Sequence, residues 1–198
     1  LYVSPSRADE ATQNNPVDLE RIFQGGRPQS IDELKAMERH QCALVEKVTA
    51  CTVAIVVGTS HGSGVLVSPD GYVLTAAHVS GAPNRPASFA LADGRQVSGK
   101  TMGVYRTLDA GMMKLDGDGP WPYAQLVEGE EVRIGQWCMA SGHPGGRREV
   151  RKPVLRVGRV LKSDRFAITT DCKLVGGDSG GPLFDMHGRV LGVNSRIG

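Results

Sequence analysis

From Cys51 onward the chain consists of short apolar runs rich in Val, Ile and Thr, interrupted by Gly, Pro and Asp. These interruptions recur about every eight to twelve residues, the spacing of a fold made of many short strands. Because β-branched residues favour strands and Gly, Pro and Asp favour turns, the pattern predicts an all-β architecture. Strands are expected near residues 51–57, 64–67, 72–76, 95–103, 110–115, 135–140, 153–161, 166–169, 182–184 and 190–195.

The first 50 residues have a different composition. Residues 1–29 are polar and rich in Pro and Gly, without a sustained period, and are expected to form a tail or an arm. Ser30 and Glu33 then have the spacing of a capping box, and apolar residues follow at near-helical intervals. One amphipathic helix is therefore predicted from about residue 31 to residue 47.

Residues 116–122 form a stiff, turn-rich segment that divides the strand region near its middle. A chain of 198 residues is long enough for one domain or for two small lobes that share an interface. The expected units are an arm with a helix (1–50), a first β-barrel lobe (51–118) and a second β-barrel lobe (123–198).

Charge and hydropathy narrow the range of partners. The 23 basic and 21 acidic residues leave a net charge of +2, too small to indicate a nucleic-acid partner. No apolar stretch approaches the roughly 20 residues that span a bilayer, so a soluble chain without a membrane span is expected. The sequence begins without Met and shows no apolar signal core, which favours a processed or trimmed product whose export signal is out of view.

The cysteines do not indicate a metal site or any other cofactor. Cys42, Cys51, Cys138 and Cys172 form no CxxC pair and have no His at zinc-ligand spacing. Their even number allows disulfides, and scattered buried thiols are equally natural, so both states stay open.

Three strings contain residues suited to nucleophilic catalysis. Ser179 lies among four glycines in the string GGDSGGPL, which lets a hydroxyl protrude while backbone N–H groups converge. His78 ends an apolar strand in YVLTAAHV, and Asp109 precedes another strand in LDAGMMKL. Alone, each has a simpler interpretation: the string around Ser179 could be a glycine-rich hairpin loop, His78 a structural histidine and Asp109 a turn residue. Together they supply a nucleophile, its base and an acceptor that orients the base.

With these residues in the order His78, Asp109, Ser179, the chain resembles the trypsin/chymotrypsin-fold serine proteases, and within them the bacterial HtrA/Deg type. The string GSGVLVSPDGYVLT before His78 resembles the lead into the family's catalytic His. SGHPGG at residues 141–146 and LGVNS at residues 191–195 also resemble family segments. The resemblance covers about residues 50–198. No PDZ module follows in the sequence, so a protease domain without that module is expected.

The resemblance implies a fold and a set of site residues. The fold would be a double β-barrel of the six-stranded Greek-key type, with an N-terminal helix added. His78, Asp109 and Ser179 would be catalytic, with the N–H groups of Gly177 and Ser179 as the oxyanion hole. The substrate would bind along residues 193–197 as an added strand. The residues expected to contact substrate are Lys173, Leu174 and Val175 at the S1 wall and Ser195, Arg196 and Ile197 at the strand edge.

Three departures from the family pattern matter. Asp178 stands where HtrA proteins commonly have Asn, and a buried carboxylate there would need a cation or several N–H donors. No Ile-Val-Gly-Gly start is present to supply an amine to Asp178 after zymogen cleavage. The sequence also ends at Gly198, soon after the strand that follows Ser179, so an unclosed second barrel is expected.

The remaining candidates have structural interpretations. Eight basic residues between 147 and 165 are expected to form a solvated strand face, since no aromatic residues are interleaved for base stacking. They are Arg147, Arg148, Arg151, Lys152, Arg156, Arg159, Lys162 and Arg165. Four histidines are expected at the surface, namely His40, His61, His143 and His187.

The leading functional hypothesis is a serine endopeptidase acting on unfolded or exposed polypeptides outside the cytoplasm, in the periplasm or as a secreted protein, as in protein quality control. It would act through an acyl-enzyme, and the P1 residue would be small or medium and apolar. A homo-oligomer formed through Tyr2, Ile22 and Phe23 is a further hypothesis. The alternative is a latent or inactive protease fold that binds peptides like a chaperone. An esterase is disfavoured because the Gly-x-Ser-x-Gly signature of α/β-hydrolases is absent.

Overall fold

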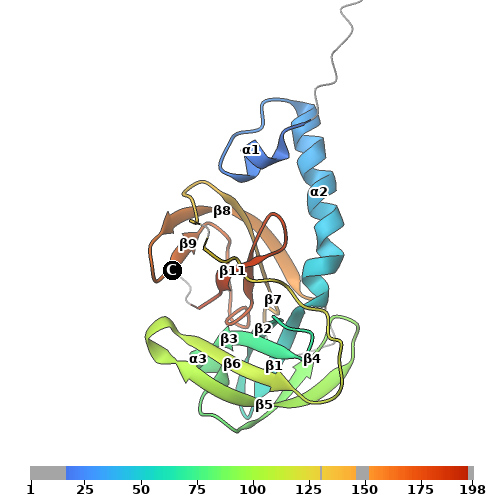
Figure 1. The fold of residues 1–198 in the computed structure, drawn as a ribbon, viewed down its shortest axis with the longest axis vertical. Helices are drawn as coiled ribbons and strands as arrows, with labels where there is room; N and C mark the ends of the chain where they lie inside the picture. The colour runs from blue at the N-terminus through green and yellow to red at the C-terminus, as the bar shows by residue number, and fades with distance from the viewer. Residues whose placement is uncertain (1–16, 130, 146–151, 196–198) are drawn as a thin grey trace, which may run out of the picture.

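The computed structural model describes residues 17–129, 131–145 and 152–195. The expectations for Tyr2, Arg196 and Ile197 therefore lie outside the described residues. Figure 1 shows two β-sheet lobes beside one long helix. Within the described ranges, none of the helices has the length and apolarity of a transmembrane segment.

The first lobe is a closed barrel of six antiparallel strands in the order β1-β2-β3-β6-β5-β4. Strands β4 and β6 alternate between buried and more exposed side chains, whereas β1 is buried along nearly its whole length, and Val, Ile and Phe residues fill the interior. The strands are β1 (Thr52–Val57), β2 (Ser60–Leu66), β3 (Tyr72–Ala76), β4 (Pro86–Ala90), β5 (Gln96–Tyr105) and β6 (Ala110–Leu115).

The second lobe is an open sheet of five strands in the order β11-β10-β7-β8-β9. Its strands are β7 (Trp137–Gly142), β8 (Val154–Ser163), β9 (Ile168–Thr170), β10 (Pro182–Asp185) and β11 (Val190–Val193). The expected two-lobed, mostly β architecture with an N-terminal helix is thus confirmed. The six-stranded closure holds for the first lobe, whereas the described part of the second lobe forms a half-barrel.

Strand β4 is the one barrel strand that the sequence pattern did not predict. It has five residues and begins with Pro86, a residue that cannot donate a ladder hydrogen bond. Its position is nevertheless essential to the barrel, because it pairs with both β1 and β5 and closes the cylinder.

Helix α2 (Ile31–Ala50) begins where the capping box predicted, with Ser30 Oγ accepting a hydrogen bond of 3.1 Å from Glu33 N. It continues three residues beyond the predicted end. A short helix that was not predicted, α1 (Leu19–Phe23), folds back beside the start of α2 (Figure 1). Ile22 and Phe23 are both buried within this one chain, so the hypothesis that they form an oligomer interface is wrong.

The four cysteines are all free thiols, and three of them are buried. Burial raises the pKa of the Cys51 thiol to about 12, whereas Cys42 is exposed on α2. Only the thiolate attacks a disulfide reagent, so a buried thiol with a raised pKa is unreactive.

We expect Cys42 to react first when the folded, reduced chain is treated with a thiol-titrating disulfide at pH 8. Cys51 should react only after unfolding in denaturant. The Cys42→Ser variant is the control and should lose the fast phase. A fast phase that survives in this variant would contradict the assignment.

Candidate active site

The barrel register places His78 next to Asp109. Strand β3 ends at Ala76 and leads directly into the short helix α3 (Ala77–Ser80), which carries His78. Ala76 is the register partner of Ala110, the residue after Asp109. The chain is fixed further by a hydrogen bond of 2.9 Å from Ala77 N to Asp109 O. The two side chains, 31 positions apart, therefore meet at one end of the barrel.

The carboxylate of Asp109 holds His78 through two hydrogen bonds. Asp109 Oδ2 lies 2.8 Å from His78 Nδ1, and Oδ1 accepts a bond of 3.0 Å from His78 N. Asp109 follows the 3₁₀ turn η1 (Arg106–Leu108) with φ of 50°, a left-handed conformation that Asp adopts more readily than most residues. Nδ1 faces the carboxylate, so Nε2 is the ring nitrogen of the half-exposed His78 that does not contact Asp109.

Ser195 supplies a third contact to the same carboxylate, which the sequence did not predict. Its Oγ donates a hydrogen bond of 2.6 Å to Asp109 Oδ2. Partial burial alone would raise the pKa of Asp109, but the bonds from Ser195 and His78 outweigh it and hold this pKa below its ordinary value. Asp109 therefore remains ionised throughout the neutral pH range. The hydroxyl of Ser195 faces Asp109, whereas the expectation from sequence concerned the backbone edge at this position.

Ser179 lies where the first barrel meets the second sheet. Its carbonyl accepts a hydrogen bond of 2.8 Å from Ser63 N of β2. The next residue, Gly180, packs so closely that a Cβ would overlap Thr75 Oγ1 and would lie 2.8 Å from Ala76 N. The loop thus contacts the end of β3 that leads to His78. In the described part of the chain Ser179 Oγ has no hydrogen bond, and the catalytic role expected for this hydroxyl stays a prediction.

The backbone N–H groups around Ser179 divide into bonded and free ones. Asp178 N donates to Val175 O at 3.1 Å, Gly180 N to Asn194 O at 2.6 Å, and Gly181 N to Asp178 O at 2.9 Å. Among residues 177–181 of the described structure, the N–H groups of Gly177 and Ser179 alone have no partner. These are the two N–H groups expected from the sequence to form an oxyanion hole, and that role stays a prediction.

The carbonyl of Gly177 is held away from these donors by Ser63. Ser63 Oγ donates a hydrogen bond of 2.8 Å to Gly177 O and accepts another of 2.8 Å from His143 N. Ser63 is fully buried. His143 is also buried, so its expected place at the surface is wrong; the backbone of its glycine-rich loop binds the first barrel through Ser63.

Asp178, which precedes Ser179, has a cation partner that the sequence did not reveal. Its side chain is 1% exposed, and its Oδ2 lies 3.1 Å from Arg156 Nη2 of β8. The same oxygen accepts a hydrogen bond of 2.9 Å from Val175 N. Arg156 therefore points inward, and the interpretation of the basic run as a solvated strand face is wrong at this position.

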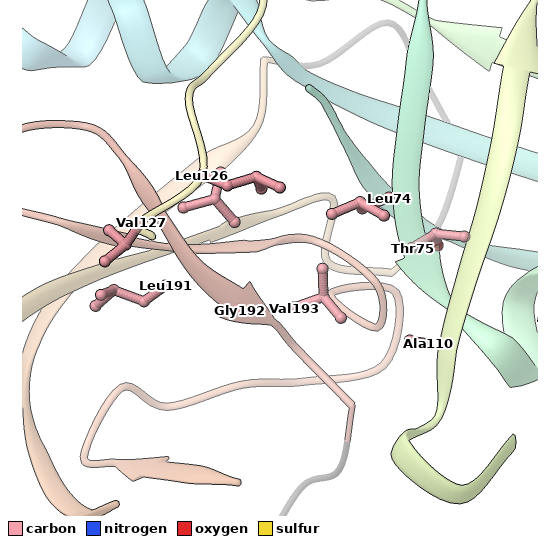
Figure 2. Close-up of a pocket in the computed structure, with 9 residues that line it drawn as sticks. Leu74, Thr75, Ala110, Leu126, Val127, Leu191, Gly192 and Val193 are labelled. Atoms are coloured by element: carbon pink, nitrogen blue, oxygen red, sulfur yellow. The ribbon is translucent and has the colours of Figure 1, made fainter. Parts of the chain in front are cut away.

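The three expected S1 residues differ in their surroundings. Leu174 packs against the buried cluster of the second sheet, Lys173 is exposed, and Val175 is half-exposed beside Asp178. None of the three lines the apolar cavity of about 260 Å³ in Figure 2. That cavity lies between the two lobes and is lined by Leu74, Thr75, Ala110, Leu126, Val127, Val190, Leu191, Gly192 and Val193.

Two β-lobes that meet around a His-Asp pair and a glycine-bounded serine define the trypsin-like class of folds. The chain belongs to the family of the trypsin-like peptidase domain, which matches residues 62–193, and within that family it is HtrA/Deg-like.

Several known proteins are similar to this chain. A probable periplasmic serine endoprotease, DegP-like, of Pseudomonas putida (strain W619) is 38% identical over 142 residues, which are 70% of this chain and 29% of the relative. The corresponding Halomonas elongata protein is 38% identical over 143 residues, 70% of this chain and 30% of that protein. The chain thus spans less than a third of the length of these relatives. The crystal structure of Deg5 has a TM-score of 0.67 and 26% identity, covering 80% of this chain and 85% of Deg5.

We expect Ser63→Ala to lower the free energy of unfolding by about 1–3 kcal/mol, because it removes the hydroxyl that bonds both the partly buried Gly177 O and the buried His143 N. Urea unfolding followed by circular dichroism measures the loss. Ser98→Ala, at an exposed position on β5, is the matched control and should change the stability by less than about 0.5 kcal/mol. Equal effects of the two substitutions would show that the hydrogen bonds of Ser63 Oγ do not contribute to the free energy of unfolding.

Proposed function

We propose that this chain is a serine endopeptidase domain that hydrolyses peptide bonds of unfolded or exposed polypeptides. The observation that carries the proposal is the pair of free N–H donors at Gly177 and Ser179. A latent, peptide-binding module would be expected to have a collapsed oxyanion loop. The free donors, together with the Asp109-held His78, favour the active form.

In the proposed mechanism, Ser179 Oγ attacks the scissile carbonyl carbon while His78 Nε2 accepts its proton. Asp109 orients the ring and stabilises the imidazolium that forms. The carbonyl oxygen becomes an oxyanion between the N–H groups of Gly177 and Ser179. His78 then passes its proton to the leaving amine as the C–N bond breaks. Water, deprotonated by the same ring, hydrolyses the acyl-enzyme and restores Ser179.

Location and specificity are proposed from the similar proteins and from the residues before Ser179. The relatives from Pseudomonas and Halomonas are named as periplasmic endoproteases, which supports an extracytoplasmic location for this chain. For the P1 pocket, Lys173, Leu174 and Val175 offer no carboxylate that would select Arg or Lys. A small or medium apolar P1 side chain is therefore proposed.

The catalytic assignment predicts that a fluorophosphonate probe labels the folded chain at Ser179 and that the chain digests casein. Ser179→Ala should abolish labelling, and His78→Ala should slow it by roughly 10⁴-fold or more, because the nucleophile and its base act as a unit. Ser98→Ala and His61→Ala, which change exposed residues of the same types, should label like the unmodified chain. Absence of labelling in a chain shown to be folded would contradict the proposal.

The specificity assignment predicts cleavage of a peptide library after Ala, Val or a similar apolar residue. The preference should appear as a higher kcat/KM, measured by mass spectrometry of the products. Efficient cleavage confined to bonds after Arg or Lys would overturn it.

A further inference from the structure

The ion pair between Asp178 and Arg156 is the buried charge pair closest to the proposed nucleophile. Asp178 is almost fully buried, and Arg156 is 19% exposed. Removing one partner of a buried pair leaves an uncompensated charge in a low-dielectric environment, which is strongly unfavourable. In the described part of the chain, Arg156 is the one cation within ion-pair distance of Asp178. The conformation of Asp178 therefore depends on Arg156.

Asp178 in turn organises the loop that carries the two free donors. Its Oδ2 accepts a bond from Val175 N, and its own N–H donates to Val175 O. Its carbonyl accepts bonds from Gly181 N at 2.9 Å and from Asn194 Nδ2 at 3.4 Å. The peptide units on either side of Asp178 contain the N–H groups of Asp178 and Ser179. Fixing this residue therefore fixes the direction of the Ser179 donor.

The position of Arg156 is itself well determined. It lies on β8, where it is the register partner of Ala140 on β7. Its carbonyl oxygen lies 3.6 Å from Cys172 Sγ, and its Nη1 lies 3.5 Å from Val154 O. On the far side of the carboxylate, Gly142 has no side chain, and a Cβ there would lie 2.7 Å from Asp178 Oδ1. The carboxylate is thus enclosed between the ends of β7 and β8.

We propose that Arg156 is a positioning residue for the reaction: its guanidinium neutralises Asp178 and thereby holds the loop in the form that leaves Gly177 and Ser179 N–H free. The inference rests on the proposed serine endopeptidase function, which it extends. Arg156 supplies from within the second lobe the positive charge that a chain amine freed by zymogen cleavage would otherwise have to supply.

The test compares kcat and KM for a peptide substrate in Arg156→Met and Arg156→Lys. Loss of one oxyanion donor typically lowers kcat about 10²–10³-fold, and we expect a loss of this size in Arg156→Met, with KM changed less than about threefold. Arg156→Lys keeps the charge and should recover most of the activity. Arg159→Met is the matched control, because Arg159 lies on the same strand but its guanidinium stacks on Trp137 at 4.4 Å. It should remain within about threefold of the unmodified chain.

A double-mutant cycle separates charge compensation from a merely structural effect. In an Asp178→Asn background Arg156 no longer faces a buried carboxylate at position 178, so adding Arg156→Met should lower kcat less than about fivefold. This double variant also buries no unpaired charge and should fold even if Arg156→Met alone does not. An equal loss in both backgrounds, or no loss in either, would overturn the proposal.

Hydrogen exchange gives a readout that does not depend on activity. Peptides covering residues 173–184 should exchange faster in Arg156→Met than in the unmodified chain, and should return toward the rate of Asp178→Asn in the double variant. If the unmodified chain is inactive, the proposed function fails, while the exchange data still decide the role of Arg156. Unchanged exchange in a folded Arg156→Met would overturn that role.

Discussion

The loop that carries Ser179 has to contact both lobes at once, and the rest of the site depends on this constraint. A side chain at Gly180 would overlap Thr75 Oγ1 and Ser63 O of the first barrel, and one at Gly181 would overlap Ser141 O of the second sheet. Backbone hydrogen bonds also join this loop to both lobes. Ser63 N of the first barrel donates to Ser179 O, and Asn194 N of the second lobe donates to Gly181 O. Glycine is required here because the two lobes approach the same few peptide units.

Asp109 connects the lobes on the other side of the site. The β3–β6 register alone brings it to His78, so this pair belongs to the first barrel. Its remaining hydrogen bond comes from Ser195, which follows β11 of the second lobe. The orientation of the proposed base is therefore set by both lobes, as is the position of the proposed nucleophile. Separation of the lobes would disrupt both together.

Much of this arrangement could be predicted from the sequence, because local patterns determine it. The capping box at Ser30 marked the start of α2, and short apolar runs marked β3 and β6 at their observed limits. The helix α1 was missed because five residues are too few to show a helical period. The burial of Ile22 and Phe23 depends on tertiary contacts, which local pattern does not contain. Two sets of expectations stay predictions. They are the limits of the two lobes, 51–118 and 123–198, and the catalytic roles of His78, Asp109 and Ser179.

Asp178 and Arg156 show that a specific motif can indicate the need for a cation without identifying the residue that supplies it. The motif around Ser179 indicated that a buried carboxylate would need compensation, yet its partner lies 22 positions earlier in a run of eight basic residues. Period-2 alternation cannot separate them, because Arg156 and Lys162 are an even number of positions apart on β8, yet Arg156 is partly buried and Lys162 is exposed. The distinction comes from the twist and register that bring Arg156 opposite Ala140, next to the end of β7. An Asn at position 178 would require no such cation, so the identity of residue 178 and the burial of Arg156 are physically coupled. A chain with the carboxylate therefore needs the arginine, whereas a chain with the amide is free of that constraint.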